Sequence, residues 1–202
     1  SVIELAKYAS IQVINGLPDL LQPCQELTYL LKKKKKMKVL KGRKMVYVGD
    51  GNNMAHSLMY AAAKVGMNMV CACPKGYQPD PKVLAEAQED ASQTGCTITV
   101  EEDVMKAVKG ADVLYTDTWA SMGQEEEHDA RKKIFAPYQI NAELLAAARP
   151  EAIVMHCLPA YRGEEITDDV IEGPQSVVFD QAENRLHVQK AIMALLMSDE
   201  RL

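Results

Sequence analysis

Short apolar runs alternate with helical patterns from about residue 40 to residue 156, and this alternation restricts the fold more than any other feature. Five runs have the length and composition of buried strands: 44–48, 68–73, 97–100, 112–116 and 152–155. Helical patterns cover residues 53–65, 81–93, 101–108, a stretch from about 124, and 141–147. Strands and helices that alternate in this way form parallel sheets with right-handed crossovers. The sequence therefore predicts an α/β fold, a doubly wound parallel sheet of about five strands with flanking helices.

The composition excludes several classes of protein. No run approaches the roughly 18 uncharged apolar residues that a membrane span needs, and no signal-peptide pattern opens the chain. Five cysteines without framework spacing fit free thiols in a reducing compartment. Nine Lys and Arg residues lie between residues 32 and 44, but no aromatic residue interleaves them and the net charge is −5, which argues against a nucleic-acid surface. We expect a cytoplasmic protein that binds neither nucleic acid nor membranes.

Two polar clusters follow predicted strands. Asp117 to Gly123 comes directly after the strand near 112–116, and His156 to Glu165 comes after the strand at 152–155. The carboxyl ends of parallel strands meet at one edge of the sheet, where open α/β sheets bind their ligands. An acid, a hydroxyl, a thiol and an imidazole gathered at this edge predict a site for a small polar substrate, and the carboxylate of Asp117 could bind an ammonium group.

The turn at Gly49–Asn53 invites a dinucleotide interpretation that its sequence does not support. A G-x-G-x-x-G fingerprint needs glycine at position 54, where the chain has Met54. Asn53 is interpreted either as a plain cap of the following helix or as an amide that points at a substrate carboxylate or amine.

Cys157 and the acids after it also have ordinary interpretations. Metal-ligand spacing is absent around His156 and Cys157, so we predict no metal site and regard Cys157 alone as a structural thiol or a site residue. Glu164 and Glu165 precede a predicted helix and are interpreted either as solvated acids or as acids that match its dipole.

Read together, four segments resemble ornithine carbamoyltransferase, a member of the aspartate/ornithine transcarbamylase family. They are Gly49–Asn53, Asp117–Gly123, His156–Pro159 and Ala182–Arg185, and they occur in that family's order. The resemblance spans essentially the whole chain. Within the family, the Ser-Met-Gly segment at 121–123 favours ornithine over aspartate or putrescine as the acceptor.

The resemblance implies a role for each matching residue. Asn53, Asp117, Ser121 and Met122 would bind ornithine, and Gln22, Gln25, Cys157, Leu158 and Arg185 would bind carbamoyl phosphate. Asp117, Cys157 and Arg185 would take part in catalysis, with Arg185 polarising the carbamoyl carbonyl. The implied reaction is the transfer of the carbamoyl group from carbamoyl phosphate to L-ornithine, which gives L-citrulline and phosphate in arginine metabolism. It uses no cofactor, and the full-length enzymes of the family form homo-oligomers, in particular trimers.

The chain departs from the family in two places. Nothing matches the Ser-Thr-Arg-Thr loop that holds the phosphate, and Gln22 stands where the family has histidine. The resemblance therefore implies that residues 1–36 are a remnant of the carbamoyl-phosphate domain with the interdomain helix. Residues 37–180 would be the ornithine-binding domain, and residues 181–202 a helix that crosses back to the first domain. We expect this chain to be inactive alone and to expose apolar side chains such as Leu27, Leu30, Ile192 and Leu196.

Two rival functions stay open at this stage. The chain could be a catalytically dead fragment or paralogue that serves as an amino-acid-binding or interaction module, which Gln22 and the missing phosphate loop would favour. It could also be a transcarbamylase for another amine, such as putrescine. Titration with several amines would separate these possibilities, because a diamine without a carboxylate should bind weakly to an ornithine site.

Overall fold

The computed structural model describes residues 2–11, 13, 39–120 and 128–197, and it contains a five-stranded, fully parallel sheet. The strand order is β3-β2-β1-β4-β5. The strands span β1 Lys44–Val48, β2 Asn68–Ala72, β3 Ile98–Glu101, β4 Val113–Thr116 and β5 Ile153–His156. The predicted α/β architecture is confirmed, and each predicted strand lies within two residues of its observed bounds.

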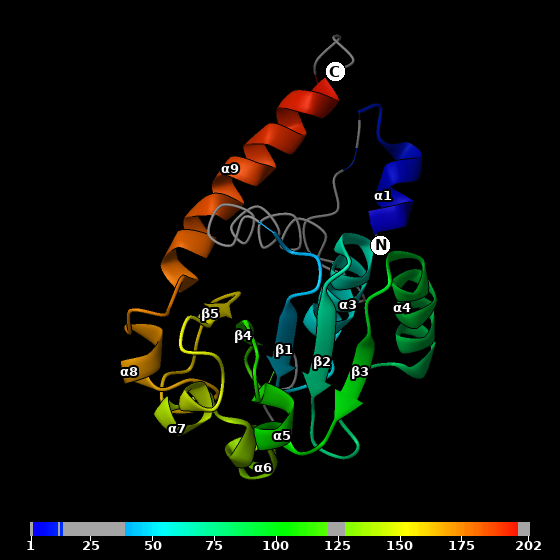
Figure 1. Cartoon of the computed structure of the whole chain (residues 1–202). Coiled ribbons are helices and arrows are strands. Elements are labelled where there is room, and N and C mark those ends of the chain that lie inside the picture. The colour runs from blue at the N-terminus through cyan, green and yellow to red at the C-terminus, as the bar shows by residue number, and fades with distance from the viewer. Residues whose placement is uncertain (1, 12, 14–38, 121–127, 198–202) are drawn as a thin grey trace.

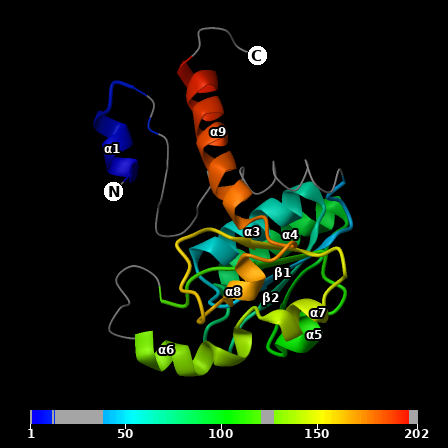
Figure 2. The same ribbon diagram turned by 90° about the vertical axis from the view of Figure 1, so that its left-hand side faces the viewer.

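Helices cover both faces of this sheet (Figures 1 and 2). On one face lie α3 (Asn53–Val65) and α4 (Pro81–Thr94). On the other lie three short helices, α5 (Val104–Val108), α7 (Ala142–Ala146) and α8 (Asp168–Ile171). The remaining described helices are α1 (Val2–Tyr8), α6 (His128–Phe135), the 3-10 turn η2 (Ala136–Tyr138) and α9 (Val178–Met197).

The strand β1 shows why the sequence forms two cores. Met45 and Tyr47 pack into the core beneath α3 and α4, whereas Val46 and Val48 pack into the core beneath α5, α7 and α8. Successive side chains of a strand point to opposite faces, so a strand that is apolar at every position must be covered on both sides. All four side chains have no exposed surface.

Two helix starts differ from the prediction. The cap of α3 is Asn52, whose side chain accepts from the backbone N–H groups of Met54 and Ala55, and Asn53 is the first helical residue. The helix expected over 101–108 begins at Val104, because Glu101 still belongs to β3 and the Asp103 side chain caps the helix. In both cases a polar residue that can accept from the helix N–H groups fixes the start.

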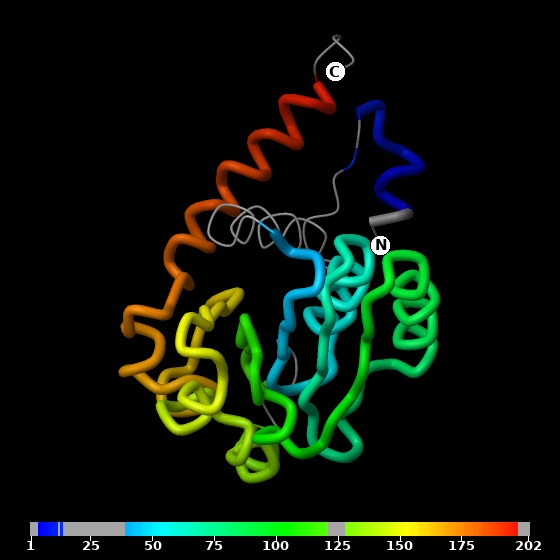
Figure 3. The backbone as a smooth tube through the Cα atoms, viewed as in Figure 1, coloured from blue at the N-terminus to red at the C-terminus, as the bar shows by residue number. Residues whose placement is uncertain are grey.

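The sheet topology places the candidate site. From β1 the chain winds outward through β2 to β3, then crosses back to lay β4 against the other side of β1, and continues to β5 (Figure 3). The direction of winding therefore reverses between β1 and β4, and such a reversal opens a crevice at the carboxyl ends of the strands. The segments after β1, β4 and β5 all begin at this edge.

Helix α9 extends away from the sheet (Figure 1). Its first residue, Val178, is fully buried, while Leu186, Met193, Leu196 and Met197 are exposed. The exposure predicted for Leu196 is confirmed and Ile192 is half-buried; Leu27 and Leu30 lie outside the described residues. Among the described residues, no helix is both long and apolar enough to cross a membrane.

Candidate active site at the carboxyl edge of the sheet

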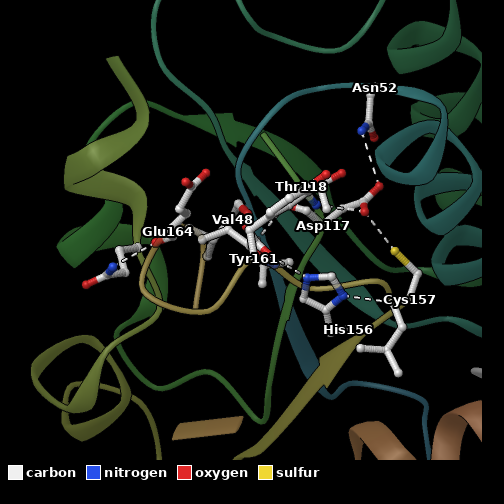
Figure 4. A network of polar contacts seen from close by, with 12 residues as sticks. Val48, Asn52, Asp117, Thr118, His156, Cys157, Tyr161 and Glu164 are labelled. Atoms are coloured by element: carbon white, nitrogen blue, oxygen red, sulfur yellow. Dashed lines mark hydrogen bonds and ion pairs between the residues drawn. The ribbon is translucent and has the colours of Figure 1, made fainter. Parts of the chain in front are cut away.

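The side chains of Asp117 and Cys157 meet directly at this edge. The Cys157 Sγ donates to Asp117 Oδ1 at 2.8 Å, and the backbone N–H of Thr118 donates to the same oxygen at 2.8 Å (Figure 4). The contact follows from the sheet register, because Thr116 at the end of β4 pairs with His156 at the end of β5. The predicted convergence of these two strand ends is confirmed for this pair.

The protonation of Cys157 limits what its sulfur can do. Burial raises the pKa of the Cys157 thiol well above its usual value, and the neighbouring carboxylate of Asp117 raises it further by repulsion and by accepting its hydrogen bond. A thiol in this environment stays protonated at neutral pH and is a poor nucleophile. The geometry therefore favours Cys157 as a hydrogen-bond donor and a wall of the site over a covalent role.

Asn52 joins the site from the turn after β1. Its Nδ2 donates to Asp117 Oδ2 at 3.4 Å, and the hydroxyl of Tyr47 donates to its Oδ1 at 3.2 Å. Asn53, predicted as a site residue, is half-buried one position later and its side chain has no hydrogen bond to the described residues. The sequence interpretation missed Asn52 because only one asparagine of the pair was assigned the role of cap.

His156 shapes the segment that follows β5. Its Nδ1 accepts from the backbone N–H of Leu158 at 2.8 Å, and its Nε2 lies 3.0 Å from Glu165 Oε1. Because Nδ1 accepts, the hydrogen-bond network assigns the ring proton to Nε2, which donates to Glu165. Leu158 has φ 56°, and the Leu158–Pro159 peptide is cis. His156 thus holds a left-handed backbone position that a leucine rarely adopts.

The interpretation of Glu165 as a solvated acid was wrong, because the residue is fully buried. Its Oε1 also accepts from the backbone N–H of Tyr161 at 2.7 Å, while its Oε2 has no partner among the described residues. Glu164 is not a free surface acid either, since it pairs with His128 and Lys132 of α6. Glu165 and His156 together fold the segment from Cys157 to Tyr161 back onto β5.

Three possible metal ligands meet at the site. Asp117, His156 and Cys157 each offer an atom within 4.8 Å of the others. Both ring nitrogens of His156, however, already take part in hydrogen bonds with Leu158 and Glu165. A metal ion could use this histidine only by breaking one of these bonds, so the residues do not form a ready three-ligand site. The absence of a metal from the active protein stays a prediction.

A buried ion pair borders the site on the side of α6. The Arg131 Nη1 donates to Asp50 Oδ2 at 2.6 Å and to the carbonyl of Trp119 at 3.0 Å, and its guanidinium lies 5.1 Å from the ring centroid of Tyr77. Burial raises the pKa of Asp50, and Arg131 opposes that shift. Arg131 therefore ties α6 to the turns after β1 and β4. The sequence contained no local signal for this pair.

The other residues predicted for the site are not brought into contact with Asp117 or Cys157 by the described part of the structure. Arg185 lies on α9, half-buried, and forms no ion pair with the described residues. Ser121, Met122, Gln22 and Gln25 lie outside the described residues. The described part of the chain thus brings Asp117 and Cys157 into contact, with Leu158 held by His156 beside them.

Sequence and structure comparisons identify the family. Residues 41–196 match the family model described as aspartate/ornithine carbamoyltransferase, Asp/Orn binding domain. The chain belongs to this family. An ornithine carbamoyltransferase of Thermococcus kodakarensis is 59% identical over 199 residues. An anabolic ornithine carbamoyltransferase of Pyrococcus furiosus is 56% identical over 196 residues.

Solved structures of this carbamoyltransferase family show the same fold. The structure of ornithine carbamoyltransferase from Pyrococcus furiosus superposes with a TM-score of 0.93 at 55% identity, over 98% of this chain and 64% of that one. The match to the Thermococcus and Pyrococcus sequences covers 97% of this chain and 62% of each relative. The chain therefore spans somewhat less than two thirds of the relatives that it matches, and it includes their acceptor-binding domain.

Proposed function

We propose that this chain is the ornithine-binding part of an ornithine carbamoyltransferase. The observation that carries the proposal is the contact between Asp117 and Cys157, which joins the ends of β4 and β5 at the reversal point of an acceptor-binding domain. In the proposed reaction the δ-amine of ornithine attacks the carbamoyl carbon of carbamoyl phosphate and forms a C–N bond. The C–O bond to phosphate then breaks, the amine loses a proton, and L-citrulline and phosphate leave.

The ornithine side of the site would use the carboxylate of Asp117. An ammonium group is recognised best by an acceptor that is already ionised and oriented, and from the described residues Asp117 accepts two hydrogen bonds on Oδ1 and one on Oδ2. Asn53, Ser121 and Met122 would complete the contacts to the amino-acid end through side-chain and backbone groups. This assignment follows the order of residues in the family.

The carbamoyl side of the site would use the segment after β5. The bend at Leu158 gives its carbonyl a fixed direction, and we propose that this carbonyl accepts from the carbamoyl NH₂ group. Cys157, as a neutral thiol, would sit beside the attacking amine. Arg185 and Gln25 would donate to the carbamoyl oxygen, where negative charge develops, and Gln22 would add a neutral donor. No covalent intermediate with the protein is needed, because both substrates are held together.

The larger assembly is part of the same proposal. Residues 1–36 would be the last part of the carbamoyl-phosphate domain, residues 37–180 the ornithine-binding domain, and residues 181–202 the helix that returns to the first domain. The complete enzyme would be a homo-oligomer, with a trimer expected, and would serve arginine metabolism. The 202-residue chain alone would bind ornithine weakly and turn over negligibly, because phosphate has no Ser-Thr-Arg-Thr loop to bind.

Titration calorimetry and a citrulline assay test this proposal. The chain should bind L-ornithine more tightly than putrescine, because only ornithine has an α-carboxylate. Joined to the N-terminal part of the Pyrococcus furiosus relative, it should form citrulline from carbamoyl phosphate, and without that part it should not. Tighter binding of putrescine would assign another acceptor, and ornithine binding without citrulline from the joined protein would favour a binding module.

A further inference from the structure

We infer that Asn52 is a positioning residue that holds the carboxylate of Asp117 toward the substrate. This inference deepens the proposed function, since it concerns the same ornithine site. Asn52 lies at the start of α3 and its amide reaches across to the end of β4, where Nδ2 donates to Asp117 Oδ2 at 3.4 Å. Asp117 is the residue proposed to bind the ammonium group, so whatever fixes its carboxylate also fixes the position of the substrate.

The orientation of the Asn52 amide is determined by its surroundings. Its Oδ1 accepts from the N–H of Met54 at 3.0 Å, from the N–H of Ala55 at 3.3 Å and from the hydroxyl of Tyr47 at 3.2 Å. An amide nitrogen cannot accept hydrogen bonds, so a flipped amide would lose all three donors. The amide oxygen must therefore face the helix, and the NH₂ group must face Asp117.

Tyr47 fixes this arrangement from within the core. It has no exposed surface, and its ring stacks on Tyr115 with centroids 6.2 Å apart. Burial and the nearby carboxylates of Asp117 and Asp50 raise the pKa of Tyr47 well above its usual value, so the phenol keeps its proton and can donate. The chain of contacts from Tyr47 through Asn52 to Asp117 thus begins on the buried central strand of the sheet.

The described contacts of Asp117 occupy its two carboxylate oxygens unequally. Among the described residues, its Oδ1 accepts from Cys157 and from the N–H of Thr118, and its Oδ2 accepts from Asn52 alone. A carboxylate oxygen has two lone pairs, so Oδ2 retains one for an ammonium donor. Without Asn52, the described contacts that orient the carboxylate would both lie on Oδ1, and ornithine binding would have to fix the position of Oδ2.

The substitution Asn52→Asp separates capping from positioning. Aspartate caps helices as well as asparagine does, so α3 should keep its start. The variant loses the NH₂ donor and places a second carboxylate beside Asp117. Ornithine binding to the 202-residue chain, measured by calorimetry, should weaken roughly 10- to 100-fold, as expected for losing a hydrogen bond to a charged group. The melting temperature should stay near that of the wild type.

Asn141→Asp is the matched control. Asn141 caps α7 through the same kind of contact, with its Oδ1 accepting from the N–H of Leu144 at 3.0 Å. It makes no contact with Asp117, so the same chemical change should leave ornithine binding unaltered. Asn52→Ser removes the donor without adding charge and still provides a cap, and it takes the place of Asn52→Asp if that variant does not fold.

A second readout does not depend on ornithine. A new carboxylate beside Asp117 should further disfavour the Cys157 thiolate, so alkylation of Cys157 by iodoacetamide at pH 9 should slow about 3- to 10-fold in Asn52→Asp and not in Asn141→Asp. If the wild type fails to bind ornithine, the proposed function fails, and the alkylation rate of Cys157 alone then tests whether Asn52 positions Asp117. Unchanged alkylation, or ornithine binding equal to that of the wild type, would overturn the positioning role of Asn52.

Discussion

Replacing Glu165 should show how strongly a single buried carboxylate supports the segment after β5. Its Oε1 accepts from His156 Nε2 at 3.0 Å and from the N–H of Tyr161 at 2.7 Å, and neither His156 nor Glu165 has any exposed side-chain surface. Glu165→Ala leaves the buried Nε2–H of His156 and the part-buried N–H of Tyr161 without this partner. At about 1–3 kcal/mol for each unpaired group, the free energy of unfolding should fall by roughly 2–6 kcal/mol.

This loss is large beside the roughly 5–15 kcal/mol that stabilises a typical domain. Urea unfolding followed by circular dichroism measures it, and Glu165→Gln is the matched control. Glutamine keeps an acceptor oxygen for both donors, so its cost should be about 1 kcal/mol. Hydrogen exchange should also show faster exchange of the Leu158 and Tyr161 amides in the alanine variant alone. A loss below about 1 kcal/mol in Glu165→Ala, or equal losses in the two variants, would refute the reasoning.

Three further predictions concern the sheet and its border. Burial raises the pKa of the Cys71 thiol from 9.0 to about 12. This thiol therefore ionises first in the unfolded chain, and the free energy of unfolding falls as the pH rises from about 9 toward 12. Between pH 8 and pH 10, the free energy of unfolding of the wild type should fall by about 1.4 kcal/mol more than that of Cys71→Val, as measured by urea unfolding with reductant. Equal losses in the two proteins would contradict this prediction. Arg131→Met should lower the free energy of unfolding by roughly 2–4 kcal/mol, because it removes the cation that pairs with Asp50. In a double-mutant cycle, the double variant with Asp50→Asn should lose less stability than the sum of the two single variants. Asp112 is buried and accepts from the N–H of Lys44 at 2.7 Å. Asp112→Ala should lower the free energy of unfolding by about 1–3 kcal/mol and accelerate hydrogen exchange of the Lys44 amide. Unchanged exchange of this amide would argue against the contact.

The sequence predicted those parts of the fold that local pattern controls. β4 and β5 are buried at every position and are nearly continuous apolar runs, so 113–116 and 153–156 were found within two residues. The convergence of Asp117 and Cys157 was predictable because parallel strands end at one edge. The register of β4 and β5 places the two residues side by side at that edge.

Residues that act through distant partners were not predictable. Arg131 and Asp50 are 81 residues apart, and nothing in either neighbourhood marks a buried ion pair. Glu165 stands in a polar stretch that resembles a helix start, yet its burial depends on the fold of the Leu158 backbone. Asn52 and Asn53 are adjacent and identical in type, and only the three-dimensional start of α3 shows which one caps the helix and reaches Asp117.

Helix α9 carries the one cationic residue proposed to meet the carbamoyl oxygen. The helix has 20 residues, so it is about 30 Å long, and Arg185 lies about 10 Å from its buried first residue, Val178. Val178, Gln181, Asn184 and Val188 are buried, and Gln181 donates to the Tyr115 hydroxyl at 3.0 Å, so the half of the helix that carries Arg185 is anchored beside the sheet. Because a productive catalytic geometry tolerates only about 0.5 Å, the reach of Arg185 depends on how closely this buried half of α9 fits against the sheet.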